Sequence, residues 1–207
     1  MSTMPIIYIG YTPLAKGIYF GDKDIQNTKI DQNIIIDVES DGIWMDHGVE
    51  YQGNEVTNNI VYGFTRSGIG ISDYSIYVDF DTCAPASNSP CFVDRFNDVV
   101  TGNKLYGLAS DENPLYLQNS YSNGQGDLTD FFGGPGGNLD NNYYFNPYRS
   151  QKVRHNQLVF GQNPLYTLPQ WKNTSAYDQN STEQSYTLSA GTPPPSIYYN
   201  ETTSPIT

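Results

Sequence analysis

Hydrophobic and polar residues alternate most regularly between residues 69 and 81. The apolar members of this stretch include Tyr74, Ile76, Val78 and Phe80, and Ser, Tyr and Asp residues separate them. A period of two, with β-branched and aromatic residues on one side, is typical of a half-buried strand. The pattern predicts a strand here and carries no information about chemistry.

Further short strands are predicted at residues 6–11, 17–20, 33–38, 43–45 and 59–64, with Gly, Asp, Ser and Pro turns between them. The three consecutive isoleucines within 33–38 fit a strand that is covered on both faces. Residues 92–100 fit either a short helix or another strand. About seven short strands at this spacing predict an all-β fold, with a sandwich or barrel-like core and long irregular loops, within residues 1–110.

The next segment, residues 111–169, is rich in Gly, Asn and Tyr, and we expect it to be irregular and to return to the core near its end. It contains the phrase Asn-Pro-Leu-Tyr twice, at 113–116 and at 163–166. We interpret both copies as corners at which a turn leads into a strand. Two such short copies do not predict a solenoid.

Residues 170–207 are predicted to form an extended C-terminal arm. This stretch is rich in Ser, Thr, Asn and Pro, and such a sequence cannot by itself bury enough apolar surface to become ordered. Two interpretations stay open, a disordered tail and an arm that becomes ordered on a neighbouring protein. In the second, the anchors are the aromatic residues spread along it: Trp171, Tyr177, Tyr186, Tyr198 and Tyr199.

The net charge of the chain limits the kinds of partner that it can bind. The formal net charge is −12 and the pI is near 4.2, so nucleic acids and anionic membrane surfaces would be repelled. No apolar run is long enough for a transmembrane helix, and the N-terminus does not resemble a signal peptide. We expect no nucleic-acid partner and no membrane insertion.

Cys83 and Cys91 are the two cysteines, and they flank a short loop that contains two prolines. We expect their Cα atoms to lie within about 7 Å of each other, the distance that a disulfide requires. Three states stay open: a disulfide, a pair of free thiols, and a metal site completed by His47 and His155.

Catalytic motifs are missing from the sequence. Asp37, Glu39, Asp41 and Gly42 match the opening of a calcium-binding loop, but the twelfth position is Gly48 instead of Glu. The sequence has no Gly-x-Ser-x-Gly and no His-Glu-x-x-His motif. We therefore expect a protein that is not an enzyme and that needs no cofactor or metal.

One basic cluster interrupts this acidic chain and consists of Arg149, Lys152, Arg154 and His155. It fits a solvated face of a strand or helix. It also fits a contact patch for an acidic surface on another copy of the protein.

A Tyr-, Asn- and Gly-rich acidic chain with a β core, a long irregular segment and an aromatic tail resembles virion structural proteins, such as minor capsid, head or tail components of viruses and tailed phages. The resemblance lies in the general character of the chain and in no motif. It implies a structural assembly role in a virion, with other virion proteins as partners in a homo- or hetero-oligomer. The alternative is an extracellular glycan-binding β module, in which Tyr and Trp stack on sugar rings.

Overall fold

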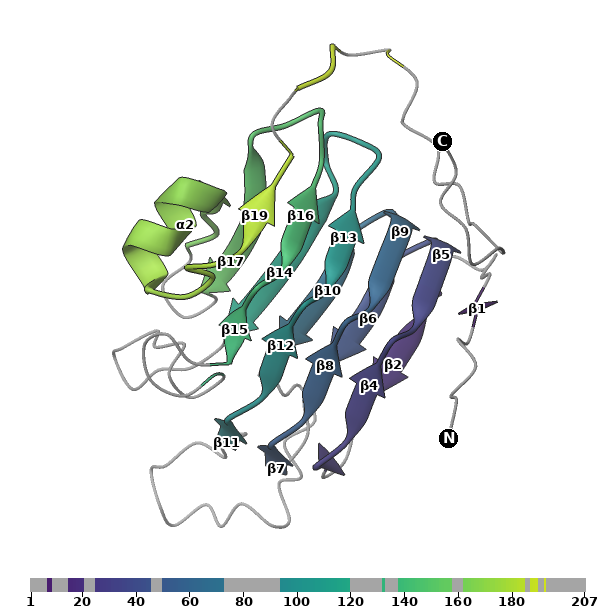
Figure 1. Ribbon diagram of the computed structural model, residues 1–207, viewed down its shortest axis with the longest axis vertical. Helices are drawn as coiled ribbons and strands as arrows, with labels where there is room; N and C mark the ends of the chain where they lie inside the picture. The colour runs from purple at the N-terminus through teal and green to yellow at the C-terminus, as the bar shows by residue number, and fades with distance from the viewer. Residues whose placement is uncertain are drawn as a thin grey trace, which may run out of the picture.

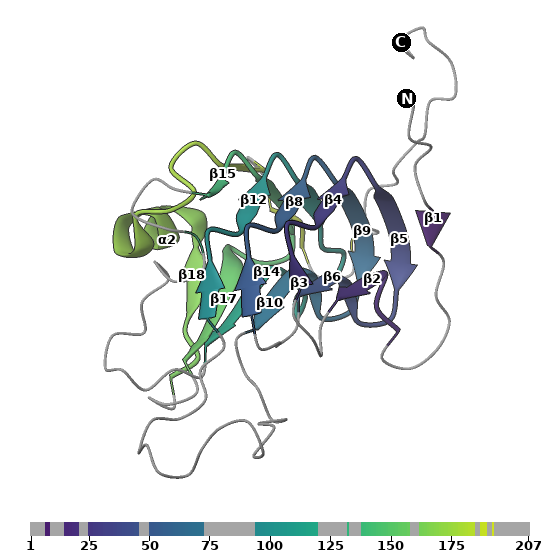
Figure 2. The ribbon, with the colours of Figure 1, turned by 90° about the horizontal axis from the view of Figure 1, so that it is seen from below.

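The computed structural model describes residues 7–8, 15–20, 25–45, 50–72, 94–119, 132, 138–157, 162–184, 187–189 and 192. The chain winds repeatedly through the same series of strand positions, and each new coil stacks on the previous one (Figures 1 and 2). Within these described residues, four sheets, which we name A to D, run along the stack, and the short helix α2 (Leu168–Ser175) closes one end.

Each sheet takes its strands from successive coils, so the order across a sheet follows the order along the chain. Sheet A contains β1 (Ile7–Tyr8), β5 (Ile34–Val38), β9 (Ile60–Phe64), β13 (Lys104–Tyr106), β16 (Tyr143–Phe145) and β19 (Thr182–Glu183). Sheet B contains β18 (Leu165–Thr167), β17 (Gln151–Gln157), β14 (Asn113–Asn119), β10 (Ser67–Ser72), β6 (Asp41–Met45) and β2 (Ile18–Phe20). Sheet C contains β11 (Asp94–Phe96), β7 (Glu50–Gln52) and β3 (Ile25–Gln26), and sheet D contains β15 (Leu139–Asp140), β12 (Val99–Thr101), β8 (Glu55–Thr57) and β4 (Lys29–Asp31).

Parallel pairing overturns the predicted architecture. Every described strand pair is parallel except β17 with β18, and each parallel pair joins strands from consecutive coils. A sandwich or an up-and-down barrel would instead place antiparallel strands beside each other. The predicted sandwich or barrel-like core is therefore wrong, and the chain forms a parallel β-helix. Inward–outward alternation is the same in both architectures, so the hydrophobic pattern could not distinguish them.

Columns of apolar side chains fill the interior of the coil. In sheet A, the paired residues Ile35, Val61, Leu105 and Tyr144 are all fully buried. Similar columns come from sheet B (Ile43, Ile69, Leu115 and Val153) and from sheet D (Ile30, Val56, Val100 and Leu139). Burial is thus repeated coil by coil, which makes each coil dependent on its neighbours.

A ladder of asparagines joins the coils at the corner between sheets D and A. The backbone N–H of Asn59 donates to Oδ1 of Asn103 at 3.0 Å, and that of Asn103 donates to Oδ1 of Asn142 at 3.0 Å. The ladder begins with Asn33, whose N–H donates to Asn59, and ends at the hydroxyl of Ser181. These buried amides satisfy backbone groups that no strand pair reaches.

Left-handed backbone conformations make these corners sharp. The residue before each ladder asparagine has a positive φ, between 56° and 70° at Asn58, Gly102 and Asn141. Gly and Asn adopt this conformation at low cost, which explains their abundance in the sequence.

The last described coil is closed by a cap. Helix α2 begins at Thr167, which forms a capping box with Gln170, and ends at Ala176 in the left-handed conformation. Trp171 and Tyr177 are 1% and 2% exposed, and β19 pairs with β16. Residues 168–184 are therefore part of the core and not of an extended arm, because the open end of a β-helix must be covered by apolar side chains.

Other predictions had mixed outcomes. Residues 94–96 and 99–101 form strands, so the strand interpretation of 92–100 is the better one. The isoleucine run has only Ile35 fully buried, while Ile34 and Ile36 are half-buried on the outside. Of residues 69–81, the first four lie in β10, and the rest lie outside the described residues. The coil continues well past residue 110, through β14 to β19.

Candidate functional site

The basic cluster is divided between the inside of the coil and its surface. Lys152 and His155 are 1% and 4% exposed, whereas Arg149 and Arg154 are half-buried and line a surface pocket. Neighbouring residues of a strand point to opposite faces, which separates Arg154 from His155. The cluster is therefore not one continuous basic patch.

The two inward members have structural roles. The Lys152 ammonium donates to the backbone carbonyl of Asn146 at 3.0 Å and lies 3.6 Å from the carboxylate of Glu183. Burial lowers the pKa of Lys152, and Glu183 opposes this shift. Burial lowers the pKa of His155 to about 4, so its ring is neutral at pH 7. The ring packs edge to face with Trp171, and the two ring centres lie 6.0 Å apart.

The two copies of Asn-Pro-Leu-Tyr lie on either side of β17. The first opens β14, which pairs with β17 in parallel, and the second leads into β18, which pairs with β17 antiparallel. The asparagine of each copy binds one arginine of the cluster. Nη1 of Arg149 lies 3.4 Å from Oδ1 of Asn113, and Nε of Arg154 lies 2.8 Å from Oδ1 of Asn163.

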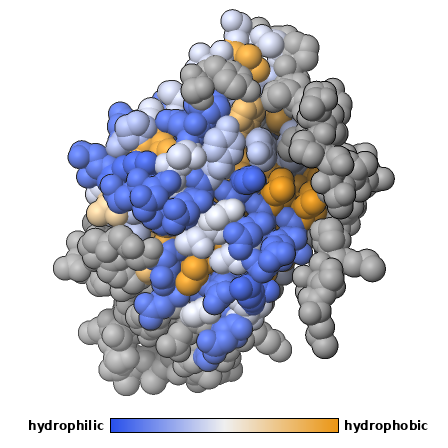
Figure 3. Space-filling model, in the orientation of Figure 1, coloured by the Kyte–Doolittle hydropathy of each residue, from blue (hydrophilic) through white to orange (hydrophobic). Residues whose placement is uncertain are grey.

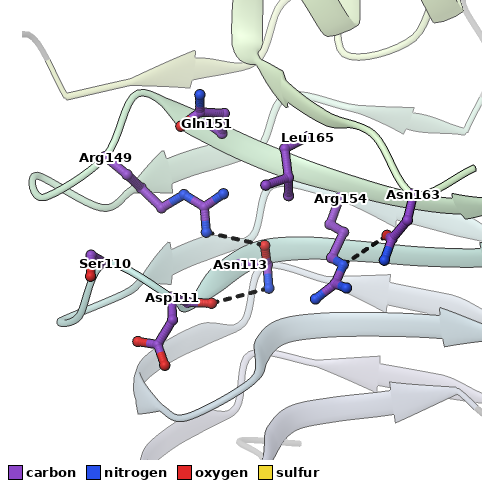
Figure 4. A pocket seen from close by; sticks show the side chains of 8 residues that line it. All are labelled: Ser110, Asp111, Asn113, Arg149, Gln151, Arg154, Asn163 and Leu165. Carbon is purple, nitrogen blue, oxygen red and sulfur yellow. Dashed lines mark hydrogen bonds between the residues drawn. The ribbon is translucent and has the colours of Figure 1, made fainter.

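Between these walls lies an open pocket of about 430 Å³ (Figure 4). Its lining residues are Ser110, Asp111, Asn113, Arg149, Gln151, Arg154, Asn163 and Leu165. The volume is within the range of about 300–1,000 Å³ that is usual for small-molecule sites. Both arginines, three amides and one hydroxyl face a space that a small polar ligand could fill.

The arginines of the pocket have unused donors. Among the described residues neither Arg149 nor Arg154 forms an ion pair, and each makes a single hydrogen bond through its side chain. Burial lowers the pKa of Arg149, and the positive charge of Arg154 adds to this shift, while Asp111 opposes it. Two guanidinium groups that line one pocket without a carboxylate partner favour an anionic ligand.

A cation–aromatic cluster lies on the outer face of sheet B next to the pocket. The Trp44 ring lies flat over Gly70, where an added Cβ would be 2.1 Å from it, and stacks with Tyr116 at 5.9 Å. The guanidinium of Arg66 covers Trp44 at 4.2 Å and binds both carboxylate oxygens of the fully buried Asp41. Because Arg66 is neutralised in this way, it supports the sheet and is not free to bind a ligand.

Tyr116 connects this cluster to the pocket. Arg154 lies 5.6 Å from the centre of the Tyr116 ring, and the Tyr116 hydroxyl donates to Gln118 and accepts from Asn156. With Asn163 holding its Nε, the Arg154 side chain is fixed at two points. Such fixation reduces the entropy that binding would otherwise cost.

The remaining predicted site residues either lie outside the described residues or serve the fold. Cys83, Cys91, His47, Tyr186, Tyr198 and Tyr199 lie outside the described residues. Asp41, in the stretch that matches the opening of a calcium-binding loop, is bound by Arg66 and Ser67, and no group of three metal-binding side chains occurs among the described residues. No described helix is long and apolar enough to span a membrane.

Sequence reasoning missed Ser110, Asp111, Asn113, Gln151, Asn163 and Leu165. The repeated Asn-Pro-Leu-Tyr phrase was the available signal, since its asparagines hold the two arginines. The comparisons with known proteins add no assignment: no family model, curated protein or solved structure matches this chain.

Proposed function

We propose that this protein is a glycan-binding module whose saccharide site is the pocket between β14, β17 and β18. The observation that carries this proposal is the lining itself, with three side-chain amides, one hydroxyl and one exposed leucine. Amides and hydroxyls pair with sugar hydroxyls, and an apolar side chain packs against the carbon-bound hydrogens of a ring. Leu165 is 45% exposed and is one of the two large hydrophobic residues in the described chain that are exposed.

The scaffold also supports a binding function. The parallel pairing of β14 with β17 and the packed core beneath them hold the two strands at a fixed spacing, so the pocket needs little ordering when a ligand enters. Asp111 is the one carboxylate in the described lining, whereas glycoside hydrolysis usually requires two. We therefore propose binding without hydrolysis. Its place outside the cell or on a virion stays a prediction.

The test is a glycan array followed by calorimetry with Gln151→Ala. The Gln151 amide lines the pocket and makes no hydrogen bond within the described chain, so its loss should affect binding alone. We expect roughly fivefold weaker binding, equivalent to one hydrogen bond of about 1 kcal/mol. Asn173→Ala, at an exposed position on α2, is the matched control and should change nothing. Absence of any bound glycan, or equal binding by the Gln151 variant, would exclude this function.

A second candidate is the assembly role expected from the sequence, in which copies of the chain associate through the outer face of sheet A. That face carries two rows of paired residues, Ile34–Ile60–Lys104–Tyr143 and Ile36–Tyr62–Tyr106–Phe145. Only Lys104 among them is charged, and Figure 3 shows hydrophobic surface over β5 and β9. A chain of net charge −12 can self-associate most easily where charge is low.

Sedimentation equilibrium tests this second role. Tyr62→Ser and Ile60→Ser together should convert an oligomer into a monomer, while Gln151→Ala should leave the oligomer intact. A wild-type protein that stays monomeric at high concentration would rule out assembly through this face. Trp171 and Tyr177, which the sequence suggested as anchors for a partner, are buried in the core. In this second role the contacts between copies are therefore made by the outer face of sheet A.

A further inference from the structure

We infer that the pocket selects an acidic saccharide, with Arg149 and Arg154 receiving its carboxylate. This inference rests on the proposed glycan-binding function and adds the class of sugar. Uronic acids and related acidic sugars combine a carboxylate with several hydroxyls and an apolar ring edge. The pocket presents a partner for each of these groups.

The two arginines define a position for the carboxylate of the bound sugar. Because Nε of Arg154 is bound to Oδ1 of Asn163, its two Nη groups remain to form the paired hydrogen bonds that carboxylates accept. Figure 4 shows Arg149 and Arg154 on opposite sides of Asn113, within one hollow. Arg149 uses only Nη1, in a long bond of 3.4 Å that a stronger acceptor could replace.

The hydroxyls have partners on the rest of the lining. The Gln151 amide is unpaired within the described chain, and the Asn163 amide nitrogen donates to no described residue. Asp111 is exposed at the rim and can accept from hydroxyls. Its negative charge also disfavours ligands of high charge density, which favours one carboxylate per sugar over a phosphate.

Local charge distinguishes this pocket from the rest of the molecule. The chain has net charge −12, yet the pocket lining contains two arginines and one aspartate. One short segment contains Arg149, Lys152 and Arg154. Lys152 is buried and lies beside Glu183, so it adds no positive charge to the surface. The remaining positive charge therefore lies within the pocket, where it would contact a bound carboxylate.

The experiment compares an oligomer of a uronic acid with an oligomer of equal length made of the corresponding neutral hexose. We expect the acidic oligomer to bind at least roughly tenfold more tightly and its affinity to fall as NaCl rises. Arg154→Gln should remove most of this preference, and the measurement is the ratio of the affinities for the acidic and the neutral oligomer in each variant. Lys104→Gln, which changes net charge equally on sheet A, is the control and should keep the preference.

Arg154→Lys separates charge from geometry, because it keeps the charge and loses the planar pair of donors. It should bind the acidic oligomer several-fold more weakly than the wild type, and circular dichroism of each variant checks that the fold is intact. Equal binding of the acidic and neutral oligomers would overturn the acidic preference while glycan binding stands. Binding of a polyglutamate peptide but of neither oligomer would overturn both.

Discussion

The backbone N–H of Asn103 donates to Oδ1 of Asn142 at 3.0 Å, although 39 residues separate them in the chain. Asn103 in turn accepts from the backbone of Asn59 and donates from its amide to the carbonyl of Val56 at 2.8 Å. Through its backbone N–H and its buried side chain, Asn103 therefore ties three consecutive coils together. The ladder explains how coils with insertions of different lengths keep the same register.

Replacing Asn103 with Ala should strongly destabilise the fold. The change leaves the N–H of Asn59 and the carbonyl of Val56 buried without these partners, and each unsatisfied group costs about 1–3 kcal/mol. We expect a loss of about 3 kcal/mol in the free energy of unfolding, measured by urea denaturation. Asn173→Ala should stay within about 0.5 kcal/mol of the wild type. A loss below about 1 kcal/mol for Asn103→Ala would mean that the ladder is not a major source of stability.

Glu112 should make stability fall as pH rises. Burial raises its pKa from 4.5 to about 7, with the opposing effect of hydrogen bonds from Leu108 and Ala109. Between these two values the folded state binds more protons than the unfolded state, so stability declines across this window and levels off above it. Urea unfolding at about pH 5 and about pH 8 should show a smaller decline for Glu112→Gln than for the wild type.

The comparison of Glu112→Gln with the wild type isolates the effect of Glu112, because both proteins contain the other groups whose pKa is shifted. The pKa of Asp178 is raised by burial to about 6 and gives a decline in the same direction. The pKa of His155 is lowered to about 4 and gives a rise in stability between that value and its usual 6.5. If both proteins show the same difference between the two pH values, Glu112 is not responsible.

We expect the effects of substitutions at Gly70 and at Trp44 on the free energy of unfolding to be coupled. An alanine Cβ at residue 70 would lie 2.1 Å from the Trp44 ring, so Gly70→Ala must displace that ring from its stack with Tyr116. We expect this substitution to cost about 1–3 kcal/mol in the wild type. It should cost at least about 1 kcal/mol less in a Trp44→Ala background, where the ring is gone. Chemical denaturation of the four proteins measures this difference, and additive effects would contradict the contact.

A chain that ends at residue 167 should not fold stably. It loses Trp171, Tyr177 and Asp178, the last of which accepts from Trp171 at 2.8 Å and from Tyr144 at 2.9 Å. The exposed end of the coil would then present apolar columns and an unpaired edge, both of which promote aggregation. Circular dichroism and light scattering would detect the loss.

Trp171→Phe is the milder companion variant, because it keeps a six-membered ring in the core while it removes the indole donor and leaves a small cavity. It should fold with stability reduced by about 1–3 kcal/mol. A truncated chain that folds as well as the wild type would instead support the extended arm that the sequence suggested.

The local pattern of hydrophobic, polar and turn residues was sufficient to predict part of the architecture. The strands predicted at 33–38, 43–45 and 59–64 correspond to β5, β6 and β9, because apolar runs and turn residues act within a few residues. Asp41 and Gly42, read as part of a turn, belong to β6. The many Asn and Gly residues of the sequence fit the left-handed corners, such as those at Asn58, Gly102 and Asn141. It did not reveal that asparagines such as Asn59 and Asn103 would stack, because 44 residues separate them.

Tertiary structure decided the strand partners and the site. Alternation assigns each side chain to a face but does not name the neighbouring strand, and coil spacings of 26, 44 and 39 residues along the ladder concealed the repeat. Arg154 and His155 are adjacent in sequence, yet the pleat of β17 sends one into the pocket and the other toward Trp171. Asn113 and Asn163 become the two walls of that pocket only because β14 and β18 pair with opposite sides of β17. Long-range pairing of this kind depends on how the whole coil packs, which no local stretch of residues specifies.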